Sequence, residues 1–250
     1  MNKLSVTIIT YNEEKNIREC LDSVRWADEI VVLDSCSTDS TERICREYTD
    51  KVFQNEWLGY GRQKNLCAER AENDWIFNLD ADEVVTPELR AGLMELLSST
   101  PSLSAYLVPR KNYFGERWIR YCGWYPDYIV RLYNKKRASF LPSDVHESVQ
   151  VDGRPGMLRG PIKHYTYSNL SDYISRQNRY SSLAAQGMAG EGREVRWYDL
   201  SLRPIFAFIK VYALRMGFRE GGLGFILSVG HSFYTFLKYV KLWEIKEMKK

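Results

Sequence analysis

The chain of 250 residues lacks several features that define common protein classes. Its five cysteines include no CxxC pair and their number is odd, which argues against a disulfide framework or a zinc site. Free thiols in a reducing compartment are the expectation. The N-terminus leads directly into an apolar, β-branched segment, so we expect no secretory signal. No internal repeat or low-complexity tract is visible.

Acidic residues are scarce in one part of the chain only. Residues 1–192 carry 24 Lys and Arg against 27 Asp and Glu, whereas residues 193–250 carry 11 against 5, a net charge of +6. This positive end coincides with the most hydrophobic segments, which favours a membrane surface over nucleic acid as its partner. The overall composition, with 44% hydrophobic and 27% charged residues, is typical of a globular protein.

The first hundred residues alternate between two kinds of pattern. Apolar, β-branched runs predict strands at 4–10, 29–34, 51–54 and 75–79, and helical spacing predicts helices between them and at 87–97. This alternation predicts an α/β fold with a mostly parallel sheet and flanking helices. Further strands are expected at 105–109, 128–133 and 147–151, and helices at 170–187, 205–218 and 225–243.

Two carboxylates follow the predicted strand at 75–79, where Asp80 and Asp82 are one residue apart. The carboxyl edge of a parallel sheet is where α/β proteins bind ligands. Closely spaced carboxylates repel each other and need a cation, and oxygen ligands suit Mg²⁺ or Mn²⁺ holding a diphosphate. A pair of solvated turn acids is the alternative.

The loops after the other strands are also polar. Asp34 ends the second strand, where it would take a ribose or a base edge, or simply cap the next helix. A sugar nucleotidyltransferase would need a glycine-rich phosphate loop after the first strand, and residues 11–14 contain no glycine.

Four segments together resemble the ordered motifs of glycosyltransferase family 2. They are residues 6–14 (VTIITYNEE), 31–39 (VVLDSCSTD), 61–65 (GRQKN) and 79–83 (LDADE). The resemblance implies a GT-A (Rossmann-like) fold and inverting transfer from a nucleotide sugar with a divalent metal, Mg²⁺ or Mn²⁺. One departure is that Glu83 stands where the family usually has a further Asp.

Later segments are similar to one branch of that family, the lipopolysaccharide core β-1,4-glucosyltransferases. They are residues 145–147 (VHE), 160–165 (GPIKHY), 217–224 and 238–244. The branch implies a UDP-sugar donor, a lipid-linked inner-core saccharide as acceptor, and a cytoplasmic location peripheral to the inner face of the bacterial inner membrane. A transferase that moves a heptose or another hexose to another glycolipid or glycan acceptor, and a non-catalytic sugar-nucleotide-binding membrane subunit, remain alternatives.

The resemblance also divides the chain by role. Residues 1–100 would form the nucleotide-sugar-binding half of the GT-A domain, and residues 101–200 the acceptor-binding and catalytic half. Residues 201–250 would be a helical segment that associates with membrane or oligomerises.

Carried over residue by residue, the resemblance assigns the nucleotide site. Thr10, Tyr11 and Glu13 would line the base site, and Asp34 would contact the base or the ribose. Asp80 would lie on the ribose or on a metal-bound water.

The resemblance assigns a second set of residues to the diphosphate and the metal. Arg62 or Lys64 would approach the diphosphate, and Asp82 would be the main metal ligand, supported by Asp80. His164 would complete the metal shell through its imidazole; a structural histidine beside tyrosines is the alternative.

Inversion requires a general base that deprotonates the acceptor hydroxyl. We choose Glu147 because residues 146–147 match the branch motif, and Asp144 and Asp127 are the other candidates. A turn acid is the alternative role for Asp144. The arginine-rich stretch 110–137, including Arg131, would contact a phosphorylated acceptor or form a solvated face.

The C-terminal helices are interrupted by Lys210, Arg215, His231 and Lys238, so they are poor candidates for membrane spans. Residues 225–243 carry an apolar stripe opposite a polar side, which predicts an amphipathic helix. With the basic tail, it fits a helix that lies in an anionic membrane interface. Packing against the catalytic domain or a homo-oligomer contact is the alternative.

Overall fold

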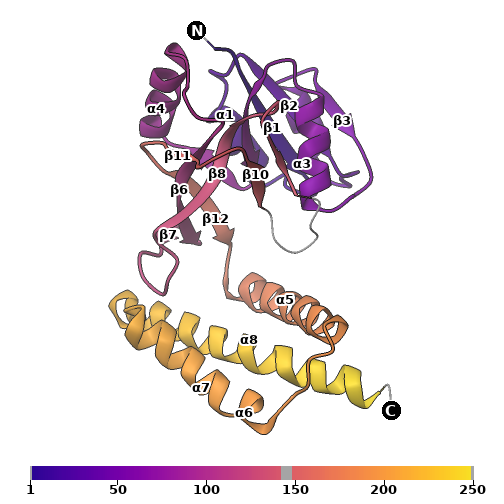
Figure 1. Cartoon of the computed structure of the whole chain (residues 1–250), viewed down its shortest axis with the longest axis vertical. Helices are drawn as coiled ribbons and strands as arrows, with labels where there is room; N and C mark the ends of the chain where they lie inside the picture. The colour runs from indigo at the N-terminus through magenta and orange to yellow at the C-terminus, as the bar shows by residue number, and fades with distance from the viewer. Residues whose placement is uncertain (1, 142–147, 249–250) are drawn as a thin grey trace. The chain divides into compact units, whose positions relative to one another are not determined.

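The computed structural model describes residues 2–141 and 148–248 (Figure 1). The chain divides into two compact units. An α/β unit comprises Met1–Arg110 and Asp127–His164, and a helical unit comprises Lys111–Pro126 and Tyr165–Lys250.

A twisted sheet forms the centre of the α/β unit. Its first four strands run parallel in the order β3 (Val52–Gln54), β2 (Glu29–Asp34), β1 (Leu4–Thr10), β4 (Trp75–Asp80). The order continues with β8 (Asp127–Asn134), β6 (Ala105–Phe114), β12 (Ile162–Tyr167) and β5 (Glu83–Val85). β8 runs antiparallel to both β4 and β6, and β12 runs antiparallel to β5.

Short strands complete the sheet structure. β7 (Arg117–Trp118) and β11 (Gly156–Met157) each pair with β6. β9 (Ala138–Phe140) and β10 (Val149–Val151) form a separate two-stranded ladder.

Within the described residues of this unit, four helices accompany the sheet: α1 (Ile17–Asp22), α2 (Thr41–Arg46), α3 (Tyr60–Glu69) and α4 (Pro87–Ser98). All seven residues of β1 are buried, as expected for a strand covered on both faces. At the start of α4 the Thr86 side chain accepts a hydrogen bond from the Leu89 N–H, and Pro87 takes the first helical position. The predicted α/β fold with flanking helices is therefore confirmed. The parallel pairing of the central ladder ends at β4, and the rest of the sheet is mixed.

The helical unit contains α5 (Leu170–Gly190), α6 (Trp197–Leu200), α7 (Leu202–Ile209) and α8 (Gly221–Glu247). A π-helical turn at Lys210–Leu214 and a 3₁₀ turn at Gly217–Glu220 join α7 to α8, with Met216 in the left-handed region at φ 53°. α8 packs against both α5 and α7. None of the helices in the described part of the chain has both the length and the apolarity that crossing a membrane requires.

Candidate active site

The carboxyl ends of the parallel strands bring the predicted loops to one edge of the sheet. In the strand register, Ile9 of β1 lies opposite Asp80 of β4, and Thr10 lies opposite Asp34 of β2. The ends of these three strands are therefore neighbours. The loops that follow β1, β2 and β4 meet at the edge where α/β folds bind nucleotides.

Asp80 is held between two cations in the structure. Lys64 Nζ lies 2.8 Å from Asp80 Oδ1, and Arg131 Nη2 bonds Oδ2. Burial by itself would raise the pKa of Asp80, but the charges of Arg131 and Lys64 and their hydrogen bonds outweigh it and hold the pKa far below its ordinary value. Lys64 itself is completely buried. Asp80 is therefore a fixed carboxylate, and the predicted roles of Asp80 and Lys64 toward the nucleotide stay predictions.

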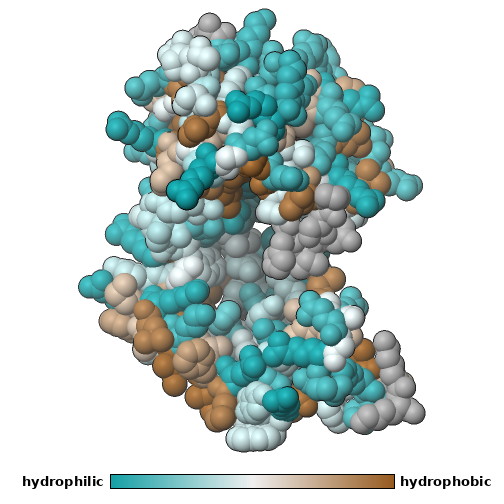
Figure 2. Space-filling view, in the orientation of Figure 1, coloured by the Kyte–Doolittle hydropathy of each residue, from teal (hydrophilic) through white to brown (hydrophobic). Residues whose placement is uncertain are grey.

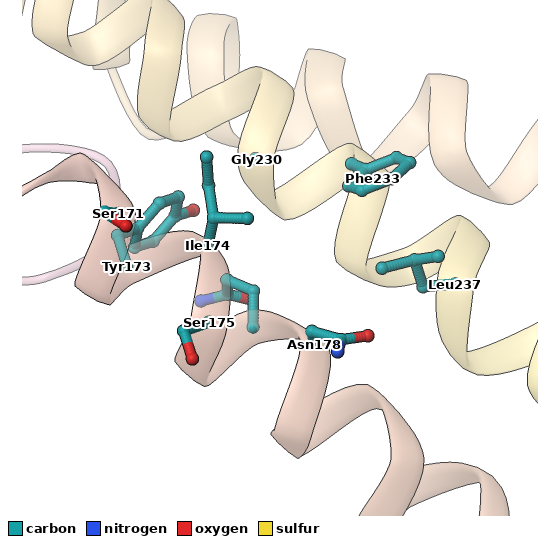
Figure 3. Close-up of a pocket in the computed structure, with 9 residues that line it drawn as sticks. Ser171, Tyr173, Ile174, Ser175, Asn178, Gly230, Phe233 and Leu237 are labelled. Carbon is teal, nitrogen blue, oxygen red and sulfur yellow. The ribbon is translucent and has the colours of Figure 1, made fainter.

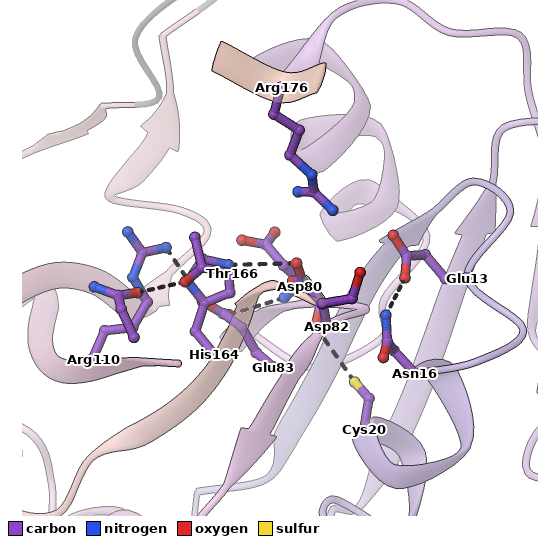
Figure 4. Close-up of polar contacts among 12 residues, drawn as sticks. Glu13, Asn16, Cys20, Asp80, Asp82, Glu83, Arg110, His164, Thr166 and Arg176 are labelled. Atoms are coloured by element: carbon purple, nitrogen blue, oxygen red, sulfur yellow. Dashed lines mark hydrogen bonds and ion pairs between the residues drawn. The ribbon is translucent and has the colours of Figure 1, made fainter. Parts of the chain in front are cut away.

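Glu83 forms a second, fully buried part of the same network. Its Oε1 lies 2.6 Å from Arg131 Nη2 and 3.4 Å from Arg110 Nη1, and its Oε2 accepts a hydrogen bond of 3.1 Å from the Asp80 N–H. Both carboxylate oxygens are therefore engaged inside the protein. Glu83 supports the turn that carries Asp80 and Asp82 (Figure 4).

Arg131 corrects one interpretation of the sequence. The stretch 110–137 suggested contact with an acceptor or a solvated face, but Arg131 is only 3% exposed. Besides the two carboxylates, its Nη1 donates to Asn78 Oδ1 at 3.0 Å. Arg131 lies on β8, which runs antiparallel beside β4. This pairing brings the guanidinium next to the carboxylates of Asp80 and Glu83. The sequence signal was present only as a single arginine among the apolar and aromatic residues in the middle of this strand.

Asp82 and His164 come together although they are far apart in the sequence. His164 Nε2 lies 3.4 Å from Asp82 Oδ2, and the two side chains are 14% and 16% exposed (Figure 4). The pairing of β12 with β5, which sets His164 opposite Glu83, produces this approach.

A carboxylate and an imidazole are ligands that Mn²⁺ and Mg²⁺ accept, although Mg²⁺ prefers oxygen. Among the described residues, no group of three or more His, Cys, Asp or Glu side chains is arranged to hold a metal ion. Two protein donors are nevertheless compatible with such a cation, which usually takes one or two carboxylates and completes its shell with substrate phosphates and water. The donor set therefore fits the predicted metal.

Thr10, the first of the predicted base-site residues, is the last residue of β1, and Tyr11 and Glu13 follow it in the loop. Thr10 is 4% exposed, and its Oγ1 has no hydrogen-bond partner within the described residues. Tyr11, the next residue, is 56% exposed. Glu13 accepts a hydrogen bond of 2.7 Å from the Asn16 side chain, which orients the carboxylate within its own loop. An unsatisfied buried hydroxyl beside an exposed ring is compatible with a ligand site.

Asp34 has a structural task in this loop. It is completely buried, and its two oxygens accept hydrogen bonds from the N–H and the hydroxyl of Ser37. Thus the carboxylate organises the loop after β2, but it does not cap the next helix, whose N-cap residue is Ser40. A contact with the base or ribose stays a prediction.

Of the remaining predicted residues, some are described by the structure and others are not. Arg62 is exposed on α3. Asp127, one of the alternative bases, forms an ion pair of 2.9 Å with Arg110 Nη2. Glu147, the predicted general base, and Asp144 lie outside the described residues.

Comparison with known proteins gives consistent assignments. The family model described as glycosyl transferase family 2 matches residues 5–164. An uncharacterised glycosyltransferase of Rickettsia typhi is 34% identical and covers 98% of this chain and 88% of its own length. The lipopolysaccharide core biosynthesis glycosyltransferase LpsC of Rhizobium meliloti is 31% identical over 98% of this chain and 94% of its own.

One solved structure resembles this chain to a limited extent. The crystal structure of Staphylococcus aureus TarS aligns with 93% of this chain at 17% identity and a TM-score of 0.43, and the chain spans about half of that protein, 49%. The family match over the α/β unit and the two full-length relatives agree with the motifs that end β1, β2 and β4. The chain is therefore a glycosyltransferase that belongs to glycosyltransferase family 2.

Proposed function

We propose that this enzyme transfers a hexose, glucose by its branch resemblance, from a UDP-sugar to a sugar of the lipopolysaccharide inner core. The observation that carries the proposal is the approach of His164 to Asp82 at 3.4 Å, beside the fixed carboxylate of Asp80. This approach supports the proposal, because a carboxylate and an imidazole that are compatible with a metal lie close together beside the end of β4. The name of the relative LpsC, which refers to lipopolysaccharide core biosynthesis, supports the acceptor class.

Asp82 and His164 would hold Mg²⁺ or Mn²⁺, with Asp80 nearby. A divalent cation there would neutralise the charge of the leaving diphosphate. Arg131 and Lys64 keep Asp80 ionised and immobile, so it can accept a hydrogen bond from a ribose hydroxyl or from water without reorganising.

The nucleotide would lie along the ends of β1 and β2. The unsatisfied Thr10 hydroxyl and the exposed Tyr11 ring offer a hydrogen bond and a stacking face to the base. Glu13 and Asp34 would contact the base or ribose. Arg62 or Lys64 would approach the diphosphate, and of the two Arg62 is the exposed one.

Glu147 would act as the general base. An inverting transfer needs a carboxylate that takes the proton of the acceptor hydroxyl while its oxygen attacks the anomeric carbon from the face opposite the diphosphate. This assignment rests on the motif at residues 145–147. Since the acceptor is lipid-linked, the reaction would take place at the inner face of the bacterial inner membrane.

The test is a transfer assay with Mn²⁺, UDP-glucose and a deacylated inner-core oligosaccharide, measuring UDP release and the new linkage by NMR. Removing a general base costs about 10²- to 10⁴-fold in rate, so Glu147→Gln should lose transfer by this factor and keep UDP binding. Asp144→Asn, three residues away, is the matched control and should stay near wild type.

Each other result has a clear meaning. Turnover of another UDP-hexose or of a heptose nucleotide would replace the glucose assignment. Absence of both transfer and donor hydrolysis with every donor would favour a sugar-nucleotide-binding subunit without catalysis. Equal losses in Glu147→Gln and Asp144→Asn would remove Glu147 from the role of base.

A further inference from the structure

The helix α8 packs with a mixed side inward, where Leu227, Tyr239 and Leu242 are buried together with hydroxyl side chains. Ser228 is completely buried and Thr235 is 7% exposed. The Ser232 hydroxyl donates to the Pro204 carbonyl of α7 at 2.7 Å, and Lys241 Nζ donates to the Asn178 carbonyl of α5 at 2.7 Å. The side of the helix that carries these residues thus faces its two neighbouring helices.

The opposite side of α8 carries large apolar side chains that other described residues leave exposed. At about 100° per residue they fall within an arc of about 100°. They are Phe225, Ile226, Val229, Phe233, Phe236 and Trp243, each 37–52% exposed. A surface helix in a water-soluble protein turns its apolar stripe to the core and leaves polar residues outside, whereas α8 also exposes an apolar stripe.

α7 and the turn after it have the same property. Pro204 and Ala207 of α7 are buried, while Ile205 and Phe206 are 58% and 59% exposed. At the end of the π-helical turn, Leu214 is 68% exposed. Figure 2 shows apolar side chains gathered over the α7 region. We call the exposed apolar residues of 200–243 the α7–α8 face; it includes thirteen of the 28 large apolar side chains that are exposed among the described residues.

Positive charge predominates in the segment that carries the α7–α8 face. Residues 200–243 are all described, and they contain six Lys or Arg and a single acid, Glu220. Glu220 is 4% exposed, with Oε2 2.8 Å from Arg117 Nη2 and Oε1 accepting from the Arg120 N–H at 2.8 Å. Arg203 is paired with Asp199 and Lys241 donates to α5, so four of the six cations, Lys210, Arg215, Arg219 and Lys238, remain to surround the α7–α8 face.

A groove lies beside this face in the helical unit. It has a volume of about 430 Å³ between α5 and α8, and Ile174, Phe233 and Leu237 contribute apolar side chains to its walls (Figure 3). Ile174 and Phe233 are themselves more than half exposed, at 54% and 51%. The groove thus extends the apolar surface from α8 to α5.

We propose that the α7–α8 face docks on an anionic phospholipid bilayer, with its apolar side chains in the interface and its cations at the headgroups. Exposed apolar area combined with unbalanced positive charge is the chemistry of an interfacial surface. A second copy of the chain fits less well, because a two-fold contact brings the same residues together and would oppose cations to cations. The inference extends the proposed function, since it rests on a lipid-linked acceptor for its biological purpose.

The test is co-sedimentation of the full chain with vesicles of phosphatidylcholine, alone or mixed with phosphatidylglycerol, without any sugar substrate. Binding to the mixed vesicles and weak binding to pure phosphatidylcholine are expected. The double variant Phe206→Glu, Leu214→Glu should lose about tenfold or more in affinity, because two inserted side chains become charged. Met94→Glu, at an exposed apolar position on α4, is the matched control and should bind like wild type.

A second variant tests the charge. Lys210→Gln should weaken binding to the mixed vesicles by about fivefold, as expected for one cation near an anionic surface, and should not affect the residual binding to phosphatidylcholine. Thermal unfolding checks that each variant is folded, which their exposed positions favour. The proposal fails if the wild-type protein binds neither kind of vesicle. It also fails if light scattering shows a dimer without lipid and the double variant Phe206→Glu, Leu214→Glu is monomeric. Because no donor or acceptor is present, either failure leaves the transfer reaction untouched.

Discussion

Arg131→Met should destabilise the α/β unit more than any other single change at its network of charges. The guanidinium bonds Asn78 Oδ1 at 3.0 Å, Glu83 Oε1 at 2.6 Å, and the Oδ2 of Asp80. Without it, the completely buried Glu83 keeps, among the described residues, only Arg110 at 3.4 Å as a cationic partner. Removing one partner of a buried ion pair costs about 3–5 kcal/mol, because the other charge stays desolvated. That is the expected loss in the free energy of unfolding.

Arg110→Met is the matched control. Arg110 is partly exposed, at 22% of its side chain, and its removal leaves Glu83 paired with Arg131. We therefore expect a loss of about 1 kcal/mol or less.

Urea unfolding of both variants and wild type, fitted with a common slope, measures the difference. Glu83→Gln in the Arg131→Met background should recover about 1–2 kcal/mol, since the unpaired carboxylate is gone. If Arg131→Met costs no more than Arg110→Met, or if Glu83→Gln brings no recovery, the network does not stabilise the site in the way described.

Two further predictions concern the pH dependence of the stability and the strain of the backbone at a glycine. The pKa of Asp80 is lowered by folding, so its contribution to stability is complete above its unfolded value of about 4 and is lost as the pH falls below that toward the folded pKa. Urea midpoints from pH 7 down to pH 2 should fall more steeply for wild type than for Asp80→Asn below about pH 4, and parallel curves would contradict this. Gly160→Ala should destabilise the fold by about 2 kcal/mol more than Gly153→Ala. Both glycines have positive φ, 86° and 87°, but only the Cβ at position 160 would meet backbone, 2.3 Å from the Leu89 nitrogen. Equal melting temperatures for the two variants would refute the crowding.

The sequence predicted the elements that create the nucleotide-binding edge. β1 and β2 have the expected bounds, Leu4–Thr10 and Glu29–Asp34, because continuous apolar runs between polar loops leave little choice for a buried strand. Parallel pairing then places the strand ends together. The approach of Asp82 and His164 was expected from family resemblance alone, since it depends on β12 pairing with β5 across a long separation in the chain.

The partners of the charged side chains could not be predicted in the same way. A lysine on a helix is expected at the surface, yet Lys64 is completely buried because Asp80 comes within 2.8 Å and the Phe140 ring centre within 5.3 Å of its Nζ. Arg131 was misinterpreted for the same reason. Hydropathy also located the apolar stripe of α8 but not the direction in which it faces, which depends on the hydrogen bonds of Ser232 and Lys241 to neighbouring helices.

Calorimetric titration of UDP, with and without Mn²⁺, tests the central claim most directly. Wild type should bind UDP more tightly with Mn²⁺, and Asp82→Asn should lose this enhancement while its urea midpoint stays near that of wild type. Asp74→Asn, which removes an exposed carboxylate paired with Lys136, should titrate like wild type. If wild type binds UDP equally well without the metal, or if Asp82→Asn keeps the full enhancement, the metal–nucleotide site at the β4–β5 turn is contradicted.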